Sequence, residues 1–233
     1  MRNDPDLYER NALDWWNPTA PAFRSLHRIH GLRVRILREW LGPYLPKSIV
    51  LDLGCGGGLL SVPLSQMGAR VVGVDRSRAS LRQAQEHGGT ETRWLAADLI
   101  ELPLQDRCAD IVILADVVEH VKARGQLLSE AARVLRRGGF LYINTVNRTR
   151  KARFLAVAVA ETVRLIPPGT HDPELFVDPD VLRSEAEARG LVCLRLLGER
   201  PKLLSTIASW AIELEPCDDL SVGYSALFVK EAP

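Results

Sequence analysis

The stretch Ile49-Val-Leu-Asp52-Leu-Gly54-Cys-Gly56-Gly57-Gly58 decides how the rest of the chain is interpreted. It is an apolar run that ends in a glycine-rich loop, and a helical pattern follows. Glycine lets the backbone turn sharply and approach a ligand closely, and the start of a helix offers unpaired N–H groups. A phosphate-binding P-loop would need Gly-Lys-Ser/Thr after the glycines, and the GxGxxG dinucleotide fingerprint would need glycine at position 59. Because Leu59 and Leu60 follow instead, the pattern is GxGxG, and neither of those two motifs is present.

The residues around this stretch alternate between short apolar runs and helical patterns. Near-continuous apolar strands separated by helices indicate a parallel sheet with helices on both faces. The order predicts an α/β, doubly wound, Rossmann-like fold with a seven-stranded, mostly parallel sheet. Residues 199–222 show no regular pattern. The expected strands cover residues 48–53, 70–74, 92–96, 110–114, 140–145, 191–197 and 226–230, and the expected helices 59–67, 77–87, 124–135 and 179–189.

A separate helical region precedes the first strand. Apolar residues recur every three or four positions over residues 21–40, which is typical of an amphipathic helix, with Gly31 as a candidate break. The chain is therefore expected to begin with a helical N-terminal arm or cap over residues 1–46, followed by the α/β domain over residues 47–233. An insertion is expected at residues 148–170, where a basic cluster precedes a short apolar run.

The composition excludes several classes of protein. The chain has 233 residues, of which 46% are hydrophobic and 25% charged, and this matches a globular domain better than a disordered one. Its 30 basic and 29 acidic residues give a net charge of +1, which argues against a nucleic-acid-binding protein. The four cysteines are widely spaced, as in proteins of the reducing cytoplasm. No apolar run reaches the ~18 residues of a membrane span, so a cytoplasmic protein is expected.

Acidic residues end or follow the next two expected strands. Asp75 ends the run Val71-Val-Gly-Val-Asp75, 21 positions after Gly54, where a carboxylate accepts hydrogen bonds from ribose hydroxyls. Asp98 follows the third strand, where a carboxylate can accept a hydrogen bond from an adenine amino group. Together with Asp52 and the GxGxG loop, these residues resemble the class I S-adenosylmethionine-dependent methyltransferases. The resemblance implies that residues 47–233 form a methyltransferase domain that uses S-adenosylmethionine.

Further segments resemble a narrower family, the O-methyltransferases of ubiquinone biosynthesis, which methylate polyprenylated catechol-type intermediates. The resemblance covers roughly residues 12–198. It implies O-methylation of a phenolic hydroxyl on an aromatic, prenylated quinol of quinone biosynthesis. The segments are Trp15-Trp16 with the later Phe23-Arg-Ser-Leu-His27-Arg28, Asp116-Val-Val-Glu119-His120, and Asn147-Arg148 with the later Gly169-Thr170-His171-Asp172.

The resemblance also implies which residues bind the cofactor. Arg33, Gly54, Asp75 and the backbone around Ala115 match cofactor-contacting positions of that family, and the guanidinium of Arg33 suits the methionine carboxylate. Cys55 is expected to act through its backbone, because the sulfonium is already an activated methyl donor and needs no covalent enzyme nucleophile. The full expected set is Arg33, Asp52, Gly54, Cys55, Gly56, Gly58, Asp75, Arg76, Asp98, Leu99 and Ala115.

Two interpretations of the acidic motif after the fourth strand stay open. Asp116, Glu119 and His120 resemble the family's E-x-x-E-H, which implies a bound divalent cation such as Mg²⁺. Such an ion would lower the pKa of a catechol hydroxyl. In methyltransferases without a metal, a Glu-His pair at this place shapes the pocket. His120 or His171 could instead be the general base, since histidine titrates near neutral pH.

The segment from Arg148 to Ile166 is similar to the family's membrane-touching insertion. A basic cluster beside a short apolar helix can lie in a lipid interface, so peripheral contact with the inner face of a membrane is expected. The other interpretation is a lid over the acceptor pocket. The chain departs from the family at His30-Gly31 and after Gly198, where Glu199-Arg-Pro replaces Tyr-Asn-Pro. These regions would contact the acceptor, so its identity stays open.

Two other functions compete with this interpretation. One is a methyltransferase for a soluble metabolite or natural product, with the segment after Arg148 as its lid. The other is a cofactor-binding subunit without catalysis. Methylation of nucleic acid is disfavoured, because the sequence contains no Asn/Asp-Pro-Pro-Tyr-type motif.

Overall fold

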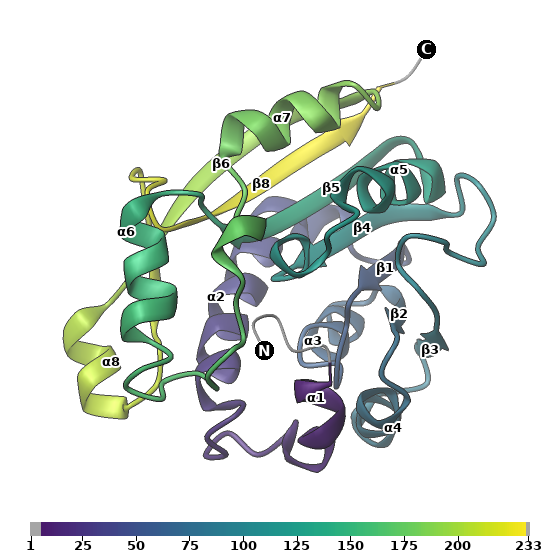
Figure 1. The fold of residues 1–233 in the computed structure, drawn as a ribbon. Coiled ribbons are helices and arrows are strands. Elements are labelled where there is room, and N and C mark those ends of the chain that lie inside the picture. Colours follow the sequence, from purple (N-terminus) through teal and green to yellow (C-terminus); the bar gives the residue numbers. More distant parts are fainter. Residues whose placement is uncertain (1–5, 232–233) are drawn as a thin grey trace.

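The computed structural model describes residues 6–231 and contains one mixed β-sheet (Figure 1). Its strands follow the order β3-β2-β1-β4-β5-β8-β6-β7. The first five are mutually parallel, and β8, β6 and β7 are added in antiparallel fashion. The strands are β1 (Ile49–Leu53), β2 (Arg70–Asp75), β3 (Thr92–Ala96), β4 (Ala109–Ala115), β5 (Leu135–Val146), β6 (Leu191–Pro201), β7 (Leu214–Cys217) and β8 (Gly223–Lys230).

The predicted α/β doubly wound fold is confirmed, with one strand more than expected. The eighth strand, β7, lies within residues 199–222, where the sequence has no regular pattern, and it pairs with the end of β6. Its four residues, Leu-Glu-Pro-Cys, include a proline and lie at the edge of the sheet. Within sheets, proline is mostly found at such edges, because it has no backbone N–H to donate a hydrogen bond to a neighbouring strand. So short an edge strand leaves little periodicity to detect.

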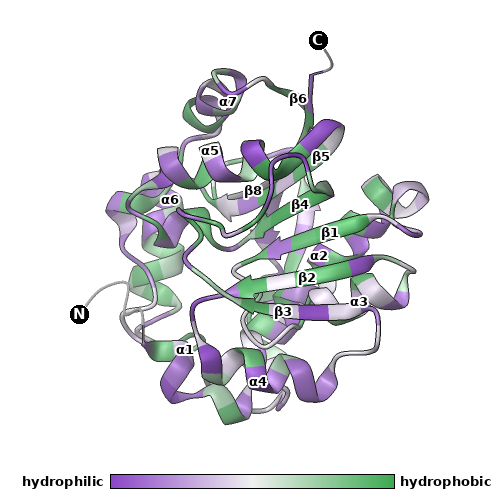
Figure 2. Ribbon diagram, turned by 90° about the vertical axis from the view of Figure 1, so that its right-hand side faces the viewer, coloured by the Kyte–Doolittle hydropathy of each residue, from purple (hydrophilic) through white to green (hydrophobic). Residues whose placement is uncertain are grey.

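Helices cover both faces of the sheet. On one face, α5 and α7 pack their apolar sides against the strands, with Leu128, Leu182 and Leu114 among the buried residues. On the other face, α2 and α3 contribute Leu37 and Leu64 to a second core. Figure 2 shows hydrophobic residues along much of β1 and β4, between these layers. The helices are α1 (Leu7–Arg10), α2 (Arg24–Leu41), α3 (Ser61–Gln66), α4 (Arg78–His87), α5 (Arg124–Val134), α6 (Arg150–Arg153), α7 (Pro179–Glu187) and α8 (Leu203–Ser209).

Helix α2 continues through Gly31, where the sequence suggested a break. A Cβ built on Gly31 meets nothing within 4 Å, so the glycine reflects no packing requirement. Leu37 and Leu41, both fully buried, point from α2 into the core beneath the sheet. The helix therefore covers one sheet face, although it lies in the expected N-terminal arm, and the boundary after residue 46 stays a prediction.

The expected insertion over residues 148–170 contains a short helix, α6, followed by a π-helical turn over Phe154–Val159. Thr149 begins α6, with its hydroxyl accepting a hydrogen bond from the amide of Ala152. Within residues 6–231, no helix combines the length and apolar character needed to cross a bilayer.

The packing of α2 can be tested with Leu37→Ala. The side chain of Leu37 is fully buried, so its truncation should lower the free energy of unfolding by about 2–5 kcal/mol. Leu13→Ala is the matched control, because Leu13 is 88% exposed and the change should cost no more than about 0.5 kcal/mol. Urea denaturation measures both. Equal stability of the two variants would contradict a core position for α2.

Candidate functional site

A cavity of about 430 Å³ opens at the edge of the sheet where β1, β2 and β4 end. Ligands of open α/β sheets bind at the carboxyl ends of the strands, and ligand cavities commonly measure about 300–1,000 Å³. The cavity collects residues that are far apart in sequence. Those expected from the sequence are Gly54, Cys55, Gly56, Asp75, Arg76, Asp98, Leu99, Ala115, Asp116 and His120.

The glycine loop after β1 has a backbone that other residues rarely adopt. Gly54, Gly56 and Gly58 have φ values of +81°, +51° and +84°, a region open to glycine at little cost. A Cβ on Gly54 would lie 2.5 Å from Val117, and one on Gly58 would lie 2.9 Å from the ring of Trp94. The loop therefore needs glycine both for its turn and for close contact with its neighbours.

Aromatic side chains from the N-terminal region pack directly onto this loop. The ring of Trp15 lies 2.4 Å from the Cβ position of Gly56, and its indole N–H donates to Ser80 Oγ at 2.8 Å. The indole N–H of Trp16 donates to the carbonyl of Gly57 at 2.9 Å. Tyr8 stacks on Trp15 and also lines the cavity. The sequence marked the tryptophan pair only by resemblance, and it gave no signal for Tyr8.

Asp75 lies at the end of β2 and faces the glycine loop. Its carboxylate accepts hydrogen bonds from the amides of Gly56 (2.9 Å) and Ser77 (2.8 Å). Burial raises the pKa of Asp75, and these hydrogen bonds oppose the shift. Asp98, after β3, accepts a hydrogen bond from the amide of Ile100 at 3.1 Å. Both residues line the cavity. The sequence predicts that Asp75 binds ribose hydroxyls and that Asp98 binds an adenine amino group, and their positions are consistent with both roles.

Asp52 lies beneath the loop rather than in the cavity. It is buried, and its carboxylate accepts a hydrogen bond from Ser61 Oγ at 2.5 Å. Burial raises its pKa to about 6, although the bond from Ser61 opposes this shift. Asp52 thus joins the end of β1 to the start of α3. Gly58 and Arg33 likewise do not line the cavity.

Arg33 is enclosed by two carboxylates. One terminal nitrogen donates to Asp116 Oδ1 at 3.1 Å, and the other donates to Glu199. Burial lowers the pKa of Arg33, but the charges of Asp116 and Glu199 outweigh it and hold the pKa above its ordinary value. Glu199 also accepts from Asn144 Nδ2 (2.9 Å) and Ser225 Oγ (2.6 Å). The sequence identified Glu199 only as a departure from the family pattern.

The two expected histidines lie together near the rim of the cavity. His120 lines it, and the ring of His171 stacks on His120 at 5.5 Å between centroids. Burial, followed by the charge of His171, lowers the pKa of His120 to about 3, so its ring is neutral near pH 7. Glu161, which the sequence did not single out, lies 3.6 Å from His171 Nδ1. Its carboxylate also accepts hydrogen bonds from the amides of Gly169 and His171.

The acidic motif after β4 does not fit a divalent cation. Asp116 is paired with Arg33, and Glu119 accepts a hydrogen bond from Thr145 Oγ1 at 2.8 Å. Burial, followed by the charge of Asp116, raises the pKa of Glu119. Mg²⁺ requires several oxygen ligands in near-octahedral geometry. Over residues 6–231, no group of three or more His, Cys, Asp or Glu side chains is arranged to hold a metal ion.

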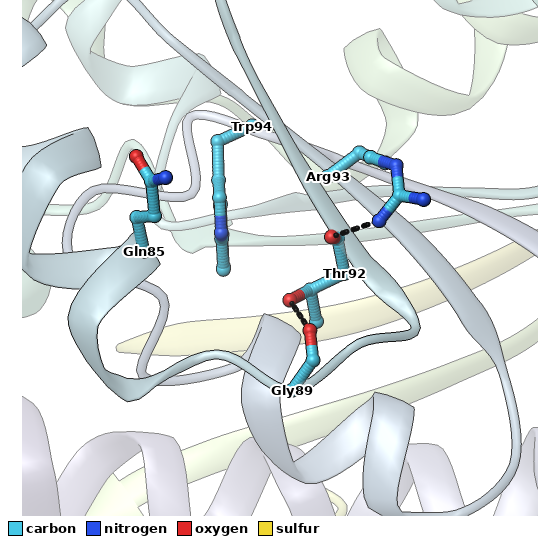
Figure 3. A pocket seen from close by; sticks show the side chains of 5 residues that line it. All are labelled: Gln85, Gly89, Thr92, Arg93 and Trp94. Carbon is cyan, nitrogen blue, oxygen red and sulfur yellow. Dashed lines mark hydrogen bonds between the residues drawn. The ribbon is translucent and has the colours of Figure 1, made fainter.

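A second cavity, of about 350 Å³, lies at the opposite end of β3 (Figure 3). Thr92 and Arg93 begin that strand, and Thr92 Oγ1 donates to the carbonyl of Gly89 at 2.6 Å. This place is at the amino end of a parallel strand, and its lining residue Trp94 also packs against Gly58. It brings together none of the residues expected to bind a ligand.

Comparison with known proteins agrees with this geometry. Residues 51–143 match the model of a methyltransferase domain. The chain is 37% identical over 204 residues to the ubiquinone biosynthesis O-methyltransferase of Rhizobium rhizogenes, covering 82% of each sequence. It is 34% identical over 211 residues to the enzyme of the same name from Agrobacterium fabrum, covering 84% of each.

Solved structures share the fold at lower sequence identity. A possible histamine N-methyltransferase from Thermotoga maritima superposes with a TM-score of 0.73 at 18% identity, covering 97% of this chain and 99% of that one. The magnesium protoporphyrin IX methyltransferase of Synechocystis PCC 6803, with SAH bound, gives a TM-score of 0.68 at 20% identity and covers 97% and 98%. At such identities the likeness concerns the fold alone, whereas the curated relatives are similar in sequence over most of their length. The chain therefore belongs to the family of ubiquinone biosynthesis O-methyltransferases and is an S-adenosylmethionine-dependent methyltransferase.

Proposed function

We propose that this methyltransferase acts on a phenolic hydroxyl of a catechol- or quinol-type aromatic acceptor, an intermediate of quinone biosynthesis. One observation carries the proposal. The cavity runs from the glycine loop and Asp75 to His120, so that one continuous space would hold the cofactor and end beside a histidine pair. The named activity of the relatives supports oxygen as the acceptor atom.

The cofactor would be held by the residues predicted from the sequence. Asp75 would bind the ribose hydroxyls, and Asp98 and Leu99 would contact the adenine. The glycines of the loop from Gly54 to Gly58 would let the ligand approach the backbone closely. When bound, S-adenosylmethionine supplies an activated methyl group on a sulfonium. Arg76, Cys55 and Ala115 complete this wall of the cavity. Asp52, Gly58 and Arg33 would act from behind it.

The chain's own contribution to the chemistry would be positioning and removal of a proton. The neutral ring of His120, whose pKa burial lowers, would accept a hydrogen bond from the acceptor's hydroxyl, and His120 or the stacked His171 would take up the proton. His171 stacks on His120, and the nearby Glu161 carboxylate would stabilise positive charge on the pair. The apolar wall, which includes Leu26, would exclude water from the reacting atoms. No step uses a metal ion.

The acceptor class can be tested with a panel of catechols, demethylated quinols and amines, using radiolabelled S-adenosylmethionine. We expect label on the phenolic oxygen of catechols and quinols, none on amines, and the same rate in the presence of EDTA. Label on a soluble amine or carboxylate would favour the alternative of a soluble metabolite. Intact binding of S-adenosylhomocysteine with no transfer to any acceptor would favour a non-catalytic subunit. A rate abolished by EDTA and restored by Mg²⁺ would contradict the proposed mechanism.

The histidine pair can be tested with His120→Asn and His171→Asn. Loss of a general base typically lowers the rate by about 10²–10⁴-fold, so we expect kcat to fall in this range for at least one variant. Binding of S-adenosylhomocysteine, measured by calorimetry, should stay unchanged. His87→Asn is the control, because His87 is exposed at the end of α4 and does not line the cavity. If kcat is unchanged in both variants, a group other than these histidines removes the hydroxyl proton of the acceptor.

We also propose that the enzyme meets its prenylated acceptor at a membrane surface. Helix α8 exposes a run of apolar side chains, Leu203 (65%), Leu204 (86%), Ile207 (67%) and Trp210 (48%), next to Lys202. Phe154, in the predicted lipid-touching segment, is 61% exposed. Ser25 Oγ joins the two segments, since it donates to the carbonyl of Leu165 and accepts from the amide of Ile212. Exposed apolar groups beside basic ones favour an anionic interface.

The membrane proposal predicts that the double variant Leu204→Ser/Ile207→Ser floats poorly with vesicles containing phosphatidylglycerol. Each apolar side chain that enters lipid contributes about 1.5–3 kcal/mol, so the bound fraction should fall by more than about tenfold. Leu13→Ser is the matched control, because Leu13 is 88% exposed on another part of the chain. If the double variant and the unchanged protein float equally, α8 does not bind the membrane and the proposal is contradicted for this helix.

A further inference from the structure

Asp116 occupies an unusual backbone conformation at the end of β4. Its φ is +56°, a left-handed value that is uncommon outside glycine and that aspartate tolerates better than most residues. Such conformations persist where the surrounding structure determines them, and they concentrate at functional sites. The turn takes the chain from β4 into the short helix over Val118–His120. It also makes Asp116 part of the cavity wall.

A network of buried groups determines how the Asp116 carboxylate lies. Arg33 donates to Asp116 Oδ1, and Glu199 binds the other terminal nitrogen of Arg33. Asn144 and Ser225 donate to Glu199 in turn. These contacts join α2, the end of β4, and strands β5, β6 and β8. The carboxylate of Asp116 is therefore ionised, and its orientation is set by residues of four other elements, α2, β5, β6 and β8.

One oxygen of this carboxylate lacks a partner. Asp116 Oδ2 is buried from solvent and has no hydrogen-bond partner within residues 6–231. A buried acceptor without a donor is unfavourable, and native structures nearly always satisfy such groups. Because Asp116 lines the cavity, a ligand there that donates a hydrogen bond and carries positive charge would satisfy the carboxylate.

The charges around Asp116 distinguish between two kinds of cation. Arg33 lies against the same carboxylate, and a divalent ion would be repelled by it more strongly than a monovalent one. A divalent ion would also need further oxygen ligands, and the described side chains do not assemble such a group. An ammonium group requires only acceptors for its hydrogens and carries a single charge.

We propose that Asp116 Oδ2 accepts the amino group of the cofactor's amino-acid part, with Arg33 and Glu199 as the residues that position it. The cavity then has two acidic ends, with Asp75 for the nucleoside and Asp116 for the ammonium. The assignment deepens the cofactor site of the proposed function and is independent of the acceptor. Arg33 lies behind the cavity wall with both terminal nitrogens paired to carboxylates, so the contact between Arg33 and the methionine carboxylate stays a prediction from the sequence.

The test compares three ligands by calorimetry. S-adenosylhomocysteine has both the amino and the carboxylate group, decarboxylated S-adenosylhomocysteine keeps only the amine, and 5′-methylthioadenosine has neither. Asp116→Asn should weaken the first two about tenfold or more and change the third by less than about twofold. Asp75→Asn is the matched contrast and should weaken all three by similar factors. Asp180→Asn, at an exposed position of α7, should change none.

Several outcomes would overturn the assignment. If Asp116→Asn weakens methylthioadenosine as much as the amines, the residue only supports the cavity. If it weakens S-adenosylhomocysteine but not the decarboxylated ligand, the site recognises the carboxylate. Unchanged binding of all three ligands would remove Asp116 from the cofactor site. Binding of Mg²⁺ alone to the unchanged protein, lost in Asp116→Asn, would make it a metal ligand.

A second pair of variants covers a failure of Asp116→Asn to fold, as judged by its thermal midpoint. Asp116→Glu keeps the charge and should keep the preference for amine-bearing ligands over methylthioadenosine. Glu199→Gln should reduce that preference by about threefold, because it loosens Arg33 without touching the cavity. If Glu199→Gln weakens all three ligands equally, or none of them, the positioning role is wrong. None of these measurements involves methyl transfer, so they are independent of the acceptor assay.

Discussion

The buried guanidinium of Arg33, held between the buried carboxylate of Glu199 and the half-buried carboxylate of Asp116, joins the separate parts of this fold. Arg33 lies on α2, Asp116 ends the parallel strand β4, and Glu199 lies on the antiparallel strand β6. A buried ion pair is weak evidence for net stability, because desolvation offsets the attraction, yet removing one partner leaves a costly unpaired charge. The network therefore specifies geometry. It sets the position of α2 relative to the sheet, and it thereby sets how α2 faces the cavity at the ends of β1, β2 and β4.

The cavity is built from the N-terminal region and from the loops that follow the parallel strands, around a glycine loop that cannot tolerate side chains. The glycines after β1 leave room for a ligand on one side and for Trp15 on the other. Residues from the N-terminal region, the parallel strands and the segment before His171 all border the same space. The end of this space beside the glycine loop and Asp75 has a form common to doubly wound proteins, whereas the end near His120 is the one that the proposed function assigns to the acceptor. We therefore expect the residues at the end near His120 to determine which acceptor is methylated.

Much of the fold could be predicted from the sequence, because its strands are apolar and its loops carry glycine. The positions of Gly54, Asp75 and Asp98 at strand ends follow from that pattern, and the structure places all three in one cavity. Strand β7 escaped prediction because it is short and lies at an edge, where packing imposes little pattern. The ion-pair partners of Arg33 were not predicted either, because Glu199 lies 166 positions away in a stretch without periodicity. Tyr8 and Glu161 were missed for a similar reason: tertiary contacts, rather than local spacing, bring them to the site.

The contact between Arg33 and Glu199 has a consequence for synthesis of the chain. During translation, α2 is synthesised early and β6 near the end. Arg33 therefore cannot pair with Glu199 until most of the protein has been made. Contacts this distant in sequence slow folding, because a long loop must close before they form. A nascent chain that lacks β6 holds the glycine loop and Asp75, but it lacks the group that braces Arg33. In the proposed assignment, the amino-acid end of the cofactor site would therefore be completed only when the ribosome has nearly finished, which would delay full cofactor affinity until the whole sheet is assembled.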